Sequence, residues 1–484
     1  MKTSTPSAST LSAASSAATY QFDWRCWPET EEAILHWIGQ AVAGHPLIGS
    51  LAQRLPEETG TRLADWVDHL VLRDQPGLTD RLERLGFVRQ EAAYALDAPA
   101  YHHPGAIFPR IAVTPASGVG AVGEVVELAL KVESIAEFSS AHNLGLTIAG
   151  YPLGPYRVAK VETPGATVGF AVVERRGYVG FDPFDGDLAR LGRLTPHAAR
   201  DALAARDLWR GRRRRFADDA EGFDFTEALL ARVIATAGDR DLACHLVFEV
   251  ERDYWMSRNR AARVQKFRQD RLGLGWANHD HHTFRCSRAF FPRTIGIFRE
   301  LGFLLREAFH AGQDAGWGAQ VLEHPTTGIV IFADLDLLPE ELDDDFSHHP
   351  LKPLPRPNTV GLWVALHGES ILDAGMHHLE AQFEFDLLRD QLQAEAGIET
   401  MKPFSDFPFL RQAFTKGETW PVAPHRADYA LAQGWIDAEQ HARFLREGAL
   451  GSHLENLQRR QGYKGFNQQA VGLIIAATDP RLAH

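Results

Sequence analysis

Residues 278–312 read NHDHHTFRCSRAFFPRTIGIFRELGFLLREAFHAG, and their hydrophobic period changes twice. The apolar residues first alternate as in a strand, then recur at helical spacing, and then alternate again as in a second strand. A hairpin with a TTG turn follows. The expected elements are a strand at 279–287, a helix at 289–303, and further strands at 304–312, 317–325 and 329–337. The order of these elements predicts a βαβββ module.

The same order of elements occurs earlier in the chain. Residues 124–132, EVVELALKV, alternate apolar and charged side chains with the period of a half-buried strand. A helix at 133–145 and strands at 156–163 and 166–178 follow. Repetition of one supersecondary unit predicts an α+β fold in which βαβββ modules form a curved mixed sheet, with helical N-terminal and inserted segments.

The remaining segments divide the chain around these two modules. Helical spacing at 28–42 and 56–72 precedes the first module, and near the C-terminus 359–369 and 470–478 read as strands and 371–396 as a helix. The expected units are a disordered tail at 1–18, a helical cap at 19–95, the first module at 96–185, a helical insertion at 186–275, the second module at 276–340, a linker at 341–358 and a C-terminal α/β unit at 359–484.

The composition limits the classes of function. The chain has 63 acidic and 50 basic side chains, and its net charge of −13 argues against a protein that mainly binds nucleic acid. No stretch approaches the roughly 20 apolar residues of a membrane span. Three cysteines without close pairing form neither a disulfide framework nor a zinc ribbon. We therefore expect a cytoplasmic protein, unusual mainly for its 22 histidines.

Alternation along the strand at 279–287 divides its side chains between two faces. One face carries His279, His281, Thr283 and Arg285, and the other carries Asp280, His282, Phe284 and Cys286. An imidazole beside a guanidinium suits a metal ligand next to a receptor for an anion. The pattern therefore favours His281 and Arg285 as the working pair over His282 and Cys286.

A metal site on this strand needs a carboxylate from elsewhere. Asp334 and Asp336 share one face of an otherwise apolar strand, where a buried carboxylate is costly unless it is paired or binds metal. In the first module, Glu174 occupies the corresponding place at a strand end. Asp334 is the favoured metal-binding acid, and Asp336 and Glu174 are the alternatives.

The site also needs a second imidazole. The segment at 100–110, AYHHPGAIFPR, supplies His103 with Arg110 after it, and His367 on the strand expected at 359–369 is the alternative. The pair His377/His378 falls in the helix expected at 371–396 and is interpreted as surface.

The repeated modules and the phrase Asp280-His281-x-x-Phe284-Arg285 resemble the vicinal oxygen chelate superfamily, and within it most of all the 2-oxoadipate dioxygenase/decarboxylase family. The resemblance implies an Fe(II) site made by His103, His281 and Asp334, with Arg285 and Arg110 as substrate-binding residues. It implies oxidative decarboxylation of a small 2-oxo acid or related carboxylate, with dioxygen as co-substrate. The family's acid is glutamate, whereas the strand at 329–337 offers aspartate.

Two other classes of function stay open at this point. The metal could serve a lyase, isomerase or hydrolase, or the fold could bind a ligand without catalysis. The sequence has none of the motifs GxxxxGK[ST], HExxH or GxSxG, which argues against the enzyme classes that these motifs define. The expected partner is a small carboxylate, with no nucleic acid and no membrane, and the oligomeric state is undetermined.

Overall fold

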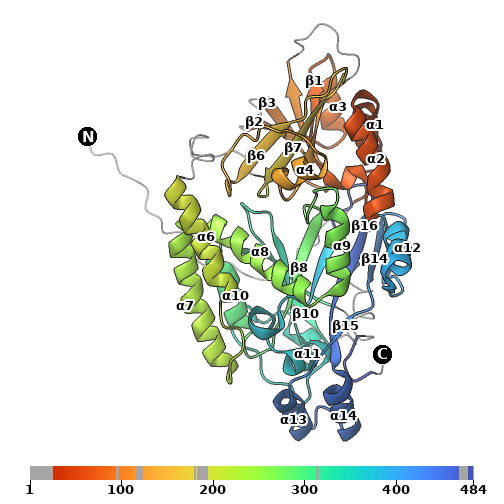
Figure 1. The fold of residues 1–484 in the computed structure, drawn as a ribbon. Coiled ribbons are helices and arrows are strands. Elements are labelled where there is room, and N and C mark those ends of the chain that lie inside the picture. Colours follow the sequence, from red (N-terminus) through yellow and green to blue (C-terminus); the bar gives the residue numbers. More distant parts are fainter. Residues whose placement is uncertain are drawn as a thin grey trace, which may run out of the picture.

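Two mixed β-sheets form the framework of the protein (Figure 1). The computed structural model describes residues 25–93, 98–115, 124–178, 181, 195–311, 316–467 and 478–482. The tail expected at 1–18 and nearly all of the strand expected at 470–478 lie outside these residues. No helix in the described ranges combines the length and the apolar character that crossing a membrane requires.

The first sheet has seven strands in the order β2-β3-β4-β1-β5-β7-β6. Its first half contains β1 (Val67–Arg73), α3 (Leu78–Arg84), β2 (Val88–Ala93), β3 (Ala98–His102) and β4 (Arg110–Thr114). Its second half contains β5 (Val125–Lys131), α4 (Ile135–Ala141), β6 (Tyr156–Lys160) and β7 (Gly169–Arg175). A single bridge between Ala149 and Val158 stands where the second half would have a further strand.

The second sheet has nine strands, eight of them in the order β13-β14-β16-β12-β8-β11-β10-β9. One half contains β8 (His279–Arg285), α10 (Phe291–Glu300), β9 (Leu304–His310), β10 (Gly318–Glu323) and β11 (Val330–Leu335). The other half contains β12 (His378–Gln382), α12 (Phe385–Ala396), β13 (Ser405–Phe407), β14 (Leu410–Phe414) and β16 (Ala449–Arg459), and β15 (Glu418–Trp420) pairs with β16.

Each half-sheet follows the order of a βαβββ unit, with the Ala149–Val158 bridge in place of one strand in the second half of the first sheet. The first strand of every unit pairs in parallel with its last strand, as in β1–β4, β5–β7, β8–β11 and β12–β16. Within each sheet the two first strands pair antiparallel, β1 with β5 and β8 with β12. The prediction of an α+β fold with repeated βαβββ modules is confirmed, but the structure contains four such units where the sequence pattern showed two.

Helices cover the sheets and join them. They are α1 (Pro28–Gly44), α2 (Pro46–Thr59), α6 (Pro196–Arg210), α7 (Asp219–Ala237), α8 (Arg240–Ser257), α9 (Arg260–Asp270), α11 (Thr359–His367), α13 (Pro424–Ala432) and α14 (Ala438–Glu447), with short turns η1 (Leu63–Trp66), η2 (Pro339–Glu341) and η3 (Ser370–Ala374). On the first sheet, Leu128 and Leu130 pack with Trp37 of α1 in one core. On the second, Phe284 of β8 packs against Phe248 of α8 and Phe298 of α10.

Three local predictions were wrong because long-range pairing overrides local propensity. The helix expected at 56–72 ends at Thr59, where Gly60 adopts a left-handed conformation (φ 67°), and the chain continues into β1. Residues 359–367 form a helix although their β-branched and aromatic content favours a strand. The helix expected at 371–396 is interrupted by β12, whose residues pair with β8 on one side and β16 on the other.

A fully buried carboxylate ties the helical insertion to the second sheet. Glu251 of α8 accepts hydrogen bonds from Trp209 Nε1 at 2.7 Å, Arg212 Nη2 at 3.0 Å and Arg214 Nη2 at 2.9 Å. Arg212 and Arg214 also donate to the carbonyl oxygens of Ile371 and Leu372, just before β12. These contacts fix the turn that leads into the strand.

Replacing Glu251 should therefore destabilise the fold strongly. Glu251→Ala leaves two buried guanidinium groups without their carboxylate, and we expect the free energy of unfolding to fall by about 3–5 kcal/mol. Urea denaturation measures this change. Glu221→Ala removes an exposed partner of Arg213 and is the control, with an expected effect within about 0.5 kcal/mol. Equal effects of the two variants would contradict the role assigned to Glu251.

Candidate metal centre

The pairing register of three strands brings a set of polar side chains onto one face of the second sheet. His281 of β8 is paired with Glu380 of β12, and Glu380 is paired in turn with Glu455 of β16. Two pairs further along, and so on the same face, Thr283 lies opposite His378. Because neighbouring strands are about 4.8 Å apart, side chains in register on one face come within contact distance.

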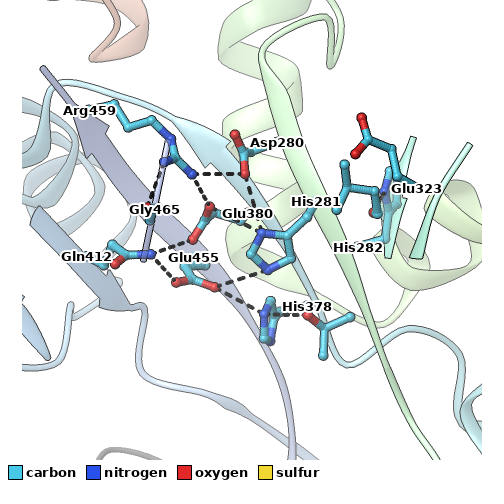
Figure 2. Close-up of polar contacts among 12 residues, drawn as sticks. Asp280, His281, His282, Glu323, His378, Glu380, Gln412, Glu455, Arg459 and Gly465 are labelled. Atoms are coloured by element: carbon cyan, nitrogen blue, oxygen red, sulfur yellow. Dashed lines mark hydrogen bonds and ion pairs between the residues drawn. The ribbon is translucent and has the colours of Figure 1, made fainter. Parts of the chain in front are cut away.

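Three of these side chains form a compact group of metal-ligating atoms. One ligand atom each of His281, His378 and Glu455 lies within 4.8 Å of the others, and all three residues are buried. Glu455 Oε2 is 3.1 Å from His378 Nε2 and 4.0 Å from His281 Nε2 (Figure 2). Two imidazoles and one carboxylate on one face are the donor set of non-haem Fe(II) enzymes.

A second layer of charged groups holds these side chains. His281 Nδ1 lies 3.2 Å from Glu380 Oε1 and 3.5 Å from Asp280 Oδ2, so its opposite nitrogen, Nε2, is the one directed at Glu455 (Figure 2). Arg459 Nη2 donates to Asp280 Oδ2 at 3.3 Å and lies 3.8 Å from Glu380 Oε1. A carboxylate on the far nitrogen of an imidazole ligand is the usual way to fix its tautomer and orientation.

The charge of this cluster fits a bound divalent cation. Three carboxylates, those of Asp280, Glu380 and Glu455, face the single guanidinium of Arg459. Burial and the neighbouring Glu380 and Asp280 raise the pKa of Glu455 well above its ordinary value. Burial lowers the pKa of His281, but the Glu380 and Asp280 carboxylates outweigh it and raise that pKa to about 9. The cluster thus attracts positive charge, which a metal ion supplies.

Two other groups among the described residues have ligand atoms equally close together, Asp280/His281/Glu380 and His377/His378/His453. In the first, the Asp280 and Glu380 oxygens already contact Arg459 and Nδ1 of His281. In the second, His377 and His453 do not line the cavity that reaches the site. Of the three groups, only that of His281, His378 and Glu455 offers two imidazoles and one carboxylate that all line the cavity.

The access is a cavity of about 860 Å³ between the two sheets. His281, His378 and Glu455 line one part of it, beside the aromatic rings of Phe332 and Phe414. The Phe332 ring lies 4.3 Å from that of His281, and the Phe414 ring lies 5.3 Å from that of His378. The volume suits a small-molecule ligand, and the aromatic wall excludes water from the metal ligands.

His103, the second imidazole favoured by the sequence, lies in a different environment. Its ring contacts Trp27, Phe87 and Phe108, and it belongs to none of the metal-ligating groups of the described residues. Burial lowers the pKa of His103 to about 4. Its position therefore supports a role as an aromatic core residue of the first sheet, and the second imidazole of the candidate group with His281 and Glu455 comes from His378.

The other predicted residues are divided between the cavity and the core. Asp334 is buried and lines the cavity, but it belongs to none of the candidate metal-ligating groups of the described residues, and the carboxylate in the group of His281 and His378 comes from Glu455. Arg110 lines the cavity, donating to Gln90 Oε1 at 2.8 Å and lying over the ring of Tyr178. Arg285 is buried over Trp363 and does not line the cavity, so its position gives no support to a substrate contact.

The alternative candidates for metal ligands, Asp336, Glu174 and His367, all contact other groups of the fold. Asp336 accepts hydrogen bonds from the backbone of Asn358 and Gly361, and Glu174 pairs with Arg157. His367 lies at the end of α11, where its Nε2 is 3.0 Å from the carbonyl oxygen of Leu450. None of the three contributes to a metal-ligating group of the described residues.

The interpretation of His377 and His378 as surface residues was wrong, because both are buried. A signal for the site was present in the sequence. His378-Leu379-Glu380 and His453-Leu454-Glu455 repeat the letters HLE, and β12 and β16 pair these residues one to one. In a strand, the two polar residues of this motif share one face and the leucine faces the core.

Comparisons with known proteins give distant likenesses only. A Ralstonia eutropha protein described as belonging to the glyoxalase superfamily is 15% identical, with a TM-score of 0.30, and the match covers 55% of this chain and 96% of that one. A mutant 4-hydroxymandelate synthase from Streptomyces coelicolor is 12% identical, with a TM-score of 0.24, covering 85% and 97%. Methylmalonyl-CoA epimerase from Mycobacterium tuberculosis is 13% identical, with a TM-score of 0.22, covering 38% and 89%.

At these TM-scores, the strand order and pairing define the fold, and the likenesses add nothing to the site. No protein-family model matches the chain, and no curated protein matches it either.

Substitution of the three ligands should abolish metal binding. We expect His281→Ala, His378→Ala and Glu455→Gln each to weaken binding by more than about 100-fold, which exceeds the loss typical of an outer-shell partner. Elemental analysis after reconstitution with Fe(II) or Zn²⁺ measures the occupancy. His103→Ala is the matched control and should keep its metal. Loss of metal from His103→Ala with retention in His378→Ala would overturn the assignment.

Metal affinity should rise with pH between about pH 6 and about pH 9. Metal binding displaces the Nε2 proton of His281, whose pKa is raised to about 9, and requires an ionised Glu455, whose pKa is also raised. Protons therefore compete with the metal more strongly as the pH falls. Competition for Zn²⁺ with a chromophoric chelator at several pH values measures the slope. Glu380→Gln should weaken binding but flatten the slope, and a pH-independent wild-type affinity would contradict the proton competition.

Proposed function

We propose that the protein is a non-haem Fe(II)-dependent oxygenase acting on a small 2-oxo acid or a related carboxylate. The observation that carries the proposal is the buried group of His281, His378 and Glu455 at the wall of a cavity of about 860 Å³. Two imidazoles and one carboxylate leave coordination positions open toward that cavity. When bound there, Fe(II) would supply positions for the substrate and dioxygen and the electrons for oxidative chemistry.

The protein's own residues position and shield the reaction. Glu380 holds the Nδ1 proton of His281 and so keeps Nε2 available for the metal. Phe332 and Phe414 cover the imidazole ligands and keep water from them. Arg110 is the one of the two predicted arginines that lines the cavity, and it offers a guanidinium fork to a substrate carboxylate.

Asp334 favours a second candidate, a metal-dependent lyase or isomerase in which the metal acts as a Lewis acid. Its carboxyl lines the cavity, and burial raises its pKa to about 7, against the opposing influence of Arg285 and His281. A group that titrates near neutral pH is suited to proton transfer. Proton transfer between carbon and a general base needs no oxidant, which separates the two candidates experimentally.

Oxygen consumption by the Fe(II)-loaded protein tests the proposal. We expect a panel of 2-oxo acids to include one that is consumed together with dioxygen and releases carbon dioxide, and no turnover in the absence of oxygen. His378→Ala should reduce the rate by more than about 100-fold, whereas His103→Ala should retain most of it. Turnover of the same substrate without oxygen, abolished by Asp334→Asn, would establish the second candidate instead.

A further inference from the structure

Gln412 is a polar side chain of the cavity wall that takes no part in the chemistry described so far. It lies on β14, is 3% exposed and lines the cavity together with Glu455. Its strand pairs antiparallel with β16, where Gln412 stands opposite Leu457, two residues beyond Glu455. Gln412 and Glu455 are therefore diagonal neighbours on one face of the sheet, and long side chains at such positions reach one another.

The amide nitrogen of Gln412 donates to two carboxylates. Its Nε2 is 2.9 Å from Glu380 Oε2 and 3.5 Å from Glu455 Oε1 (Figure 2). Ionised carboxylates only accept hydrogen bonds, so the amide has to present its NH2 group to them and not its oxygen. The Oε1 atom of Gln412 is left buried without a hydrogen-bond partner. The position thus keeps an amide at a cost, which the contacts with the two carboxylates offset.

The two oxygens of Glu455 have different surroundings. Oε2 faces the imidazole ligands, 3.1 Å from His378 Nε2 and 4.0 Å from His281 Nε2. Oε1 is the oxygen that accepts from Gln412. A carboxylate binds a metal ion through one oxygen or through both, and a hydrogen bond to the second oxygen favours binding through one. The amide therefore holds Oε1 apart from the place where the ligand atoms meet.

Gln412 also connects Glu455 with the carboxylate that supports His281. The Oε2 atom of Glu380 accepts from Gln412, and its Oε1 atom lies 3.2 Å from His281 Nδ1. Two carboxylates side by side repel each other, and a donor between them offsets that repulsion. One amide thus fixes the position of Glu455 relative to His281, two of the three ligands.

We propose that Gln412 is a positioning residue that restricts Glu455 to a single metal-binding oxygen, Oε2, and so keeps one more coordination position open toward the cavity. Around a six-coordinate ion, two imidazoles and one carboxylate oxygen leave three open positions, whereas a second oxygen of Glu455 would leave only two. A 2-oxo acid that chelates through its carboxylate and keto oxygens takes two positions, and dioxygen needs a third. The need for the third position rests on the proposed function, whereas the effect of Gln412 on Glu455 does not.

Simultaneous binding of oxalate and nitric oxide to the Fe(II)-loaded protein tests the number of open positions. Oxalate chelates through two oxygens, and nitric oxide takes one position and gives an electron paramagnetic resonance signal with Fe(II). In the wild-type protein, saturating oxalate should leave the affinity for nitric oxide unchanged within about twofold. In Gln412→Met, which removes the donor from a side chain of similar length, Glu455 can take the third position. Oxalate should then weaken nitric oxide binding by about tenfold.

Gln320→Met is the matched control. Gln320 is a buried glutamine of β10 in the same sheet, its Nε2 donates to the carbonyl oxygen of Glu307 at 2.8 Å, and it does not line the cavity. This variant should bind oxalate and nitric oxide together, as the wild type does. If Gln412→Met does not fold, Gln412→Asn takes its place. It draws the amide back by one carbon atom and should weaken nitric oxide binding in the presence of oxalate in the same direction.

A crystal structure of the Fe(II)-loaded protein, prepared without oxygen, examines Glu455 directly. We expect one bond from Glu455 to the metal in the wild type, through Oε2, and two bonds in Gln412→Met. Two bonds in the wild type would overturn the proposal, because Gln412 would then not restrict the carboxylate.

The binding experiment has further outcomes that would overturn the proposal. Competition between oxalate and nitric oxide in the wild type would do so, as would simultaneous binding in Gln412→Met or equal weakening in Gln320→Met. The proposed function has a separate fate. If the two probes behave as expected but no 2-oxo acid is consumed with dioxygen, the role of Gln412 stands and the proposed function fails. If oxygen-dependent turnover is found and Gln412→Met binds both probes together, the function stands and the inference fails.

Discussion

The register between β8, β12 and β16 is the constraint on which the site depends. Antiparallel pairing sets His281 against Glu380, and parallel pairing sets Glu380 against Glu455. A shift of one residue in either pairing would turn the polar face of that strand toward the helical core. Leu379 and Leu454, buried in the core behind β12 and β16, oppose such a shift because their apolar side chains would enter the cavity.

The same register creates an electrostatic problem that a bound cation would solve. It brings the carboxylates of Asp280, Glu380 and Glu455 close together, the last two buried and the first half-buried, with Arg459 as the neighbouring guanidinium. Like charges at this spacing are unfavourable in a low dielectric unless protons or cations neutralise them. The raised pKa values of His281 and Glu455 favour protons at these positions, and a divalent ion bound by the cluster would replace such protons. The cavity side of the sheet is thus prepared for a cation before any substrate enters.

Sequence patterns located the part of the site that lies on a strand with regular alternation of its side chains. The alternation of side chains along β8 predicts the strand and the face that carries His281. The two regular modules predict the fold class. β12 was missed because Leu, Met, Ala and Glu in the segment at 372–382 favour a helix, whereas the strand exists through its two neighbours. His378 and Glu455 are 97 and 174 residues from His281, and only the pairing of the two modules of the second sheet makes them neighbours.

X-ray absorption at the metal edge of the Fe(II)- or Zn²⁺-loaded protein tests the central claim most directly. The account predicts a first shell with two imidazole ligands and otherwise oxygen, of which Glu455 contributes the carboxylate, and Glu455→Gln should alter that oxygen shell or empty the site. A first shell with three imidazoles that is unchanged in Glu455→Gln would place the metal at His377, His378 and His453 instead, and would contradict the account.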